Sequence, residues 1–244
     1  MKRIILVPLC LCAFGVSVRA DYNNPPGWEN DPYFTHQSWS FSNATVPGEP
    51  MAADTGFVNS SGTPTLTFQG AQWVGNMGMV FEPFEPFNPL GERSGGWQIS
   101  GPQDHVPWLS IQVPNIANPG MEKEVWFEMT FRVSDMQLAG NIVNQVSFDC
   151  YADGILDDAH KFSYSDQEGG VIGVDMLGQI WLRFEGKFSF APQPGSELMI
   201  LTGSLANGQS VVLDQMDVDT HCIPEPATLG LLGIGAIGWL RRRS

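Results

Sequence analysis

Two acidic side chains flank a tryptophan in the stretch KEVWFEMTFRV. Glu124, Trp126 and Glu128 alternate with apolar residues, so they share one face of a predicted strand. Glycoside hydrolysis needs two carboxyl groups roughly 5 to 10 Å apart, whereas Glu124 and Glu128 are about 13 Å apart at the rise of a strand. The three residues therefore favour the solvated outer face of a sheet. A sugar-binding face, with the ring stacked on the sugar, is the alternative.

A second group of carboxylates lies in the stretch DCYADGILDD, which offers the oxygen ligands that calcium prefers. Asp153, Asp157 and Asp158 are the candidate ligands. The stretch does not follow the EF-hand pattern, because Tyr151 stands at the second acidic position and His160 at that of the bidentate glutamate. A β-turn with solvated acids is favoured over an irregular calcium loop, and no other cofactor is predicted.

Motifs of the common enzyme classes are missing from the sequence. It contains no GxSxG nucleophile elbow, no P-loop and no dinucleotide-binding glycine pattern. The four histidines, His36, His105, His160 and His221, have no metal-ligand spacing. We therefore expect a protein without enzymatic activity.

The middle of the chain predicts an all-β body. Short alternating apolar runs are separated by glycine and proline, and Asn207-Gly208 is a typical hairpin turn. The spacing fits an antiparallel, jelly-roll-like β-sandwich at residues 65–223, with a barrel as the alternative. A polar, irregular arm at residues 21–64 precedes it. The predicted strands are residues 63–70, 71–81, 108–113, 123–133, 141–151, 160–165, 170–176, 179–190, 197–205 and 210–218.

The charge of residues 21–223 limits the partners of this body. Six lysines and arginines face twenty-five aspartates and glutamates, a formal net charge of −19. Such a body should repel nucleic acid and anionic lipid. No nucleic-acid partner is therefore expected.

The first twenty residues predict an export signal. Lys2 and Arg3 precede an apolar stretch, and small residues at Val18 and Ala20 suit a signal peptidase. Residues 1–20 are thus a predicted signal peptide, cut between Ala20 and Asp21.

The last residues, 224–244, combine three features in a fixed order. Pro224, Glu225 and Pro226 come first, the thirteen apolar residues 228–240 follow, and the chain closes on a basic cluster. The apolar run is shorter than the roughly 20 residues of a stable spanning helix, and positive charge is held on the cytoplasmic side. We expect a short helix that occupies the membrane transiently during export. The basic cluster is Arg241, Arg242 and Arg243.

This tail resembles the PEP-CTERM sorting signals of bacteria. The resemblance rests on Pro224-Glu225-Pro226, the glycine- and leucine-rich run and the terminal arginines. It implies processing by exosortase, a membrane-embedded cysteine transpeptidase. It also implies delivery to the cell surface or extracellular matrix of a Gram-negative-type bacterium. It implies nothing about the body.

Export also affects the interpretation of the two cysteines outside the signal peptide. Cys150 and Cys222 both lie on the apolar face of predicted strands, and an oxidising exterior favours a disulfide between them.

Taken together, the sequence predicts a secreted, non-enzymatic surface or matrix protein. A carbohydrate-binding module, with extracellular polysaccharide as partner, is the alternative, and a polysaccharide-acting enzyme is a weaker one.

Overall fold

The computed structural model describes residues 28–42, 46, 48–54, 58–81, 89–118, 120–133, 136–163 and 165–224. The predicted signal peptide, with its cut between Ala20 and Asp21, lies outside these residues. So does the tail beyond Pro224, with its predicted membrane helix and arginines. Within the described part of the chain, no helix has the length and apolar character needed to cross a membrane.

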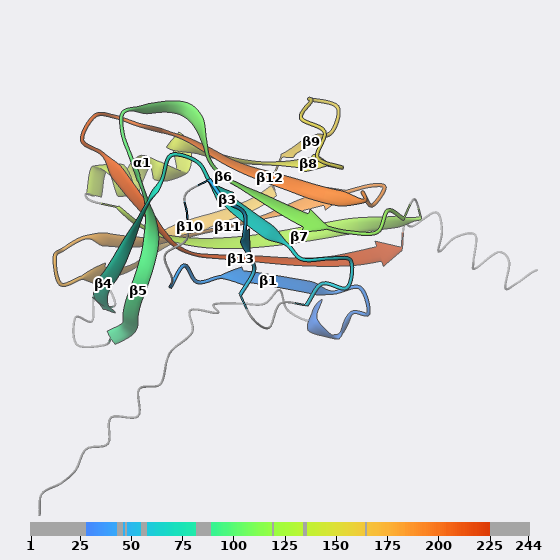
Figure 1. Cartoon of the computed structure of the whole chain (residues 1–244), viewed down its shortest axis with the longest axis horizontal. Coiled ribbons are helices and arrows are strands. Elements are labelled where there is room, and N and C mark those ends of the chain that lie inside the picture. Colours follow the sequence, from blue (N-terminus) through green and yellow to red (C-terminus); the bar gives the residue numbers. More distant parts are fainter. Residues whose placement is uncertain are drawn as a thin grey trace, which may run out of the picture.

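Two antiparallel sheets pack face to face, which confirms the predicted all-β sandwich (Figure 1). A short 3-10 helix, η1 (Trp28–Asn30), precedes them. Sheet A contains β1 (Thr35–Trp39), β4 (Gln72–Phe81), β5 (Pro89–Ser100), β7 (Met121–Val133), β10 (Ser165–Asp175), β11 (Ile180–Phe190) and β13 (Ser210–Pro224). Sheet B contains β2 (Met51–Ala52), β3 (Thr65–Phe68), β6 (Gln103–Pro114), β8 (Val146–Ala152), β9 (Lys161–Ser163) and β12 (Ser196–Leu205).

Sheet A closes on itself at one end. Strand β13 pairs with β7 along most of its length, and its first residues also pair with β5. The ring continues from β5 through β4, β10 and β11 back to β7. Further along, β1 takes the place of β5 on the same edge of β13. The jelly-roll order of strands stays a prediction.

The main core fills the space between the sheets, and β7 shows why. Val125, Phe127, Met129, Phe131 and Val133 are all buried on the inner face, as their alternation predicted. The ring of Phe127 lies 4.3 Å from that of Phe148 on β8, which belongs to the opposite sheet. Aromatic contact thus joins the two layers.

Two glycines make room for large rings in this core. Gly186 is the cross-strand neighbour of Phe127, and a Cβ atom there would lie 2.7 Å from the ring. A Cβ atom at Gly203 would lie 2.2 Å from the ring of Trp108. These distances are far below van der Waals contact, so the glycines are needed for packing.

One helix interrupts the β architecture and corrects the sequence prediction. Residues 141–145 were expected in a strand, but they belong to α1 (Met136–Gln145), and only β8 after it is extended. Leu138 and Ile142 are four residues apart, so both lie on one helical face, and both are buried. The helical period therefore prevails over the short apolar run, and α1 lies at one end of the sandwich (Figure 1).

The N-terminal arm is more regular than its composition predicted. Strand β1 pairs with β13 in sheet A, and β2 pairs with β3 in sheet B. The arm is thus part of both sheets.

Strand β5 was also missed by the sequence prediction, because Gly91, Gly95 and Gly96 hide any apolar alternation.

Candidate functional site

The predicted trio Glu124, Trp126 and Glu128 lies on the face of sheet A that points away from sheet B. Neighbouring strands add side chains at the same level. Trp126 lies between Asp219 of β13 and Lys187 of β11. We call this surface the polar face; its members are Glu124, Trp126, Glu128, Asp217, Asp219, His221, Glu185, Lys187, His36 and Ser38.

The polar face is not the solvated surface that the alternation predicted. Glu128 is only 2% exposed and Asp219 only 1%. The arm explains part of this, because His36 of β1 bonds to Asp219 at 2.6 Å. A strand pattern identifies which residues share a face, but it does not show that another part of the chain lies against that face.

Glu124 is held by a network that reaches the arm. His221 Nε2 lies 2.8 Å from Glu124 Oε2, and Lys187 pairs with the same carboxylate. Trp28 of η1 stacks on the His221 ring at 3.9 Å. Burial alone would raise the pKa of Glu124, but the hydrogen bonds from Lys187 and His221 lower it below its ordinary value. Glu124 is therefore an ionised structural anchor.

Asp217 has the opposite character. It is buried next to Glu128, its cross-strand neighbour, and burial raises its pKa to about 7. Hydrogen bonds from Ser38 and Gln215 oppose that shift without cancelling it. Sequence reasoning missed this pair of carboxyl groups, because the partners lie on strands whose pairing no local pattern reveals.

The exposed part of the polar face presents an aromatic ring beside a charged group. The cross-strand neighbours Glu128 and Asp217 are almost fully buried, which leaves little access for a substrate. Trp126 is half-buried, and Lys187 beside it is also partly accessible. An aromatic ring next to charged hydrogen-bonding groups can hold a sugar ring against the sheet.

The candidate calcium loop uses its carboxylates internally. Asp153 Oδ1 accepts a hydrogen bond from the backbone of Gly195, and Asp157 Oδ1 accepts bonds from Ala159 and His160. Asp158 is exposed. Among the described residues, no group of three or more acidic, histidine or cysteine side chains is arranged to hold a metal ion. We place no calcium ion in this loop.

The predicted disulfide is not formed. Cys150 and Cys222 are free, buried thiols, one on each sheet. A disulfide needs Cα atoms within about 7 Å, whereas facing sheets are about 10 Å apart. Burial raises the pKa of Cys222 to about 11 and that of Cys150 well above its ordinary value. The apolar parity of the two cysteines was correct, but parity does not bring two strands within bonding distance.

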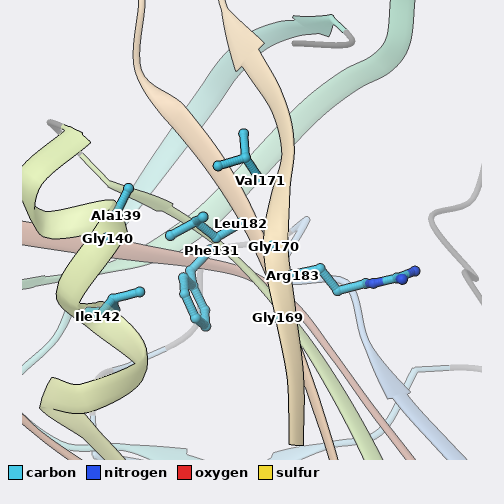
Figure 2. Close-up of a pocket in the computed structure, with 9 residues that line it drawn as sticks. All are labelled: Phe131, Ala139, Gly140, Ile142, Gly169, Gly170, Val171, Leu182 and Arg183. Carbon is cyan, nitrogen blue, oxygen red and sulfur yellow. The ribbon is translucent and has the colours of Figure 1, made fainter.

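A hollow of about 280 Å³ lies between α1 and the strands β10 and β11. Figure 2 shows Ala139 and Ile142 on one side and Val171 on the other, while the Arg183 side chain points away. The lining is apolar and offers no convergent polar groups, so it does not define a chemistry. No pattern in the sequence indicated this hollow.

Comparison with known proteins identifies a sorting motif that begins at the end of the described chain. Residues 223–244 match the PEP-CTERM protein-sorting motif. This confirms the predicted resemblance of the tail and shows that the chain carries a signal for export to the cell envelope. Strand β13 ends at Pro224, so the motif begins where the sheet ends. No curated protein matches the chain.

Two solved structures show weak similarity to the body. The CBM22-1 xylan-binding domain of Paenibacillus barcinonensis Xyn10C is 13% identical, with a TM-score of 0.31, over 74% of this chain and 90% of that one. The K1 cleaved adhesin domain of Lys-gingipain from Porphyromonas gingivalis W83 is 11% identical, with a TM-score of 0.33, over 75% and 97%. At these TM-scores, neither structure bears on what this chain does.

Proposed function

We propose that this chain is an exported, non-enzymatic protein of the cell surface or extracellular matrix, processed at its tail by an exosortase-type transpeptidase. The match of residues 223–244 to the sorting motif is the observation that carries this proposal. The motif begins where β13 ends, so a cut beyond Pro224 would leave both sheets whole. The burial of the cross-strand neighbours Glu128 and Asp217 supports a role without catalysis.

Processing of the tail gives the first testable prediction. The protein extracted from the envelope of a host with an exosortase should start at Asp21 and lack roughly the last 20 residues, the lengths typical of a signal peptide and a sorting tail. Intact-mass analysis measures both ends. The Glu225→Ala variant should keep its tail, whereas Glu122→Ala, on β7, should be cut normally. A wild-type chain that still ends in Ser244 would contradict the proposal.

The second candidate function is the binding of extracellular polysaccharide at the polar face. The specific observation in its favour is the position of Trp126, half-buried and set between Asp219 and Lys187 on neighbouring strands. Binding there would give the displayed protein a partner in the matrix and would not require turnover.

If Trp126 stacks on a sugar, the Trp126→Ala variant should lose affinity for polysaccharide about tenfold or more, which corresponds to about 1.4 kcal/mol. Affinity electrophoresis against a panel of soluble polysaccharides measures this loss. Met176→Ala is the matched control, because that side chain is exposed on a turn away from the polar face. Equal affinity of the Trp126→Ala variant and the wild type would eliminate the site, and released reducing ends would indicate an enzyme instead.

A further inference from the structure

A buried ion pair crosses the space between the sheets near the two free cysteines. Lys123 of β7 and Glu197 of β12 are 1% and 0% exposed, and Lys123 Nζ lies 3.0 Å from Glu197 Oε1. The lysine projects inward between Cys222 and Phe190, its cross-strand neighbours. Two charges enclosed by apolar groups are expensive, so this pair needs a reason beyond stability.

Asn115 completes the group. Its side-chain nitrogen donates to the same atom, Glu197 Oε1, at 3.0 Å, and also to the backbone oxygen of Pro194. The lysine and asparagine nitrogens are thus each 3.0 Å from one oxygen and no more than twice that distance apart. On the other side of the amide, Gln193 Nε2 donates to Asn115 Oδ1 at 3.0 Å.

We propose that Lys123 and Asn115 form an intramolecular isopeptide bond, with Glu197 as the proton carrier and Gln193 as the donor to the developing oxyanion. The side chains have the four parts that such a reaction needs: a nucleophilic amine, an amide carbon, a shared acid–base group and a hydrogen-bond donor on the carbonyl oxygen. Lys123, Glu197 and Gln193 are buried and Asn115 is half-buried, and fixing the four in one cluster makes the reaction effectively unimolecular.

The reaction begins with the transfer of one proton from the Lys123 ammonium to Glu197. Burial raises the pKa of Glu197, which favours the protonated form of this acid. The lone pair of Nζ then attacks Cγ of Asn115, and the carbonyl electrons move to Oδ1, which Gln193 stabilises. Nζ gives up a proton, Nδ2 receives one through Glu197, and the Cγ–Nδ2 bond breaks. Ammonia leaves and the carbonyl re-forms, so no oxidant or reductant is needed.

The neighbouring thiols do not compete as nucleophiles. Burial raises the pKa of both Cys150 and Cys222, so each stays protonated. The cross-link would join the end of β6 in sheet B to the start of β7 in sheet A. It would do so without the disulfide that the sequence predicted.

The wild-type protein provides the decisive test. A protease that cleaves after glutamate separates residues 93–122 from the dipeptide Lys123-Glu124. With the isopeptide bond, the two stay joined, and mass spectrometry finds them lighter than their sum by one ammonia molecule. Full-length protein kept in denaturant from synthesis onward should lack the bond. Unmodified residues 93–122 from folded, aged wild-type protein would overturn the proposal.

Single substitutions test the role that each residue has in forming the bond. Lys123→Arg and Asn115→Ala should abolish the bond, and Glu197→Gln should slow its formation at least tenfold. Asn115→Asp should restore it with loss of water in place of ammonia. Lys161→Arg is the matched control, because Lys161 also forms a 3.0 Å ion pair, with Asp149, but is about one-third exposed. A bond that survives Lys123→Arg would show that another amine reacts, and the assignment would be wrong.

Discussion

The Asp217→Asn variant is expected to be more stable than the wild type at pH 8 by roughly 2–4 kcal/mol and equally stable near pH 4. Asp217 is buried beside Glu128, Asp219, His36 and Gln215, and its pKa in the folded protein is about 7. An unfolded chain ionises this group near its ordinary value of 3.8. Burial of the charge is therefore unfavourable, and asparagine avoids it while still accepting the hydrogen bond from Gln215.

The sign of the pH dependence follows from proton counting. Between about pH 4 and pH 7, the folded protein holds a proton on Asp217 that the unfolded chain has released. Stability therefore falls as the pH rises through this window. Asp214, whose pKa burial raises to about 6, acts in the same direction and remains in the variant.

Urea unfolding of both proteins across this pH range measures the effect. Asp158→Asn is the matched control, because Asp158 is exposed, and its substitution should change stability by less than about 0.5 kcal/mol. If Asp217→Asn lowers stability equally at all pH values, the carboxylate is a favourable partner in the folded state and the prediction fails.

The Phe127→Ala variant should lose about 3–5 kcal/mol of unfolding free energy. Its side chain is fully buried and contacts rings from both sheets, with Phe148 at 4.3 Å and Phe188 at 5.4 Å. A typical domain has only about 5–15 kcal/mol in total. The shift of the urea midpoint gives the loss of unfolding free energy if its dependence on urea concentration is unchanged. A change in that dependence would indicate an altered unfolded state instead.

Gly186 provides a control for the mechanism of this loss. Gly186→Ala alone should cost about 1–3 kcal/mol, because its Cβ atom would overlap the Phe127 ring. The double variant Phe127→Ala/Gly186→Ala should be more stable than the sum of the two losses implies, since the missing ring leaves space for the new methyl group. Additive losses would show that the glycine does not make room for the ring.

The sequence predicted those parts of the fold that have a local period. The alternation of residues 123–133 defined the inner face of β7 correctly, and the turn at Asn207-Gly208 separates β12 from β13 as expected. It failed at α1, because residues 141–145 were assigned to the strand that follows, although Ile142 shares a helical face with Leu138. It failed at β5, where glycines carry no side-chain pattern.

The candidate sites were predictable only in part, for a related reason. The trio Glu124, Trp126 and Glu128 follows from one strand, but Asp217 reaches Glu128 only through the pairing of β7 with β13. The group of Asn115, Lys123 and Glu197 needs the contact between opposite sheets. No single-strand pattern contains that information, whereas the sorting tail is a linear motif and was identified from its letters alone.

The place of β13 in sheet A has a mechanical consequence. A transpeptidase or a matrix that pulls on the tail applies its force at Pro224, the last residue of this strand. Strand β13 is hydrogen-bonded to β7 on one edge and to β1 and β5 on the other. The last four residues, 221–224, pair with β7 alone, but detaching residues 216–220 requires two ladders to break together. The load on the attachment point is therefore shared by three neighbouring strands, β1, β5 and β7.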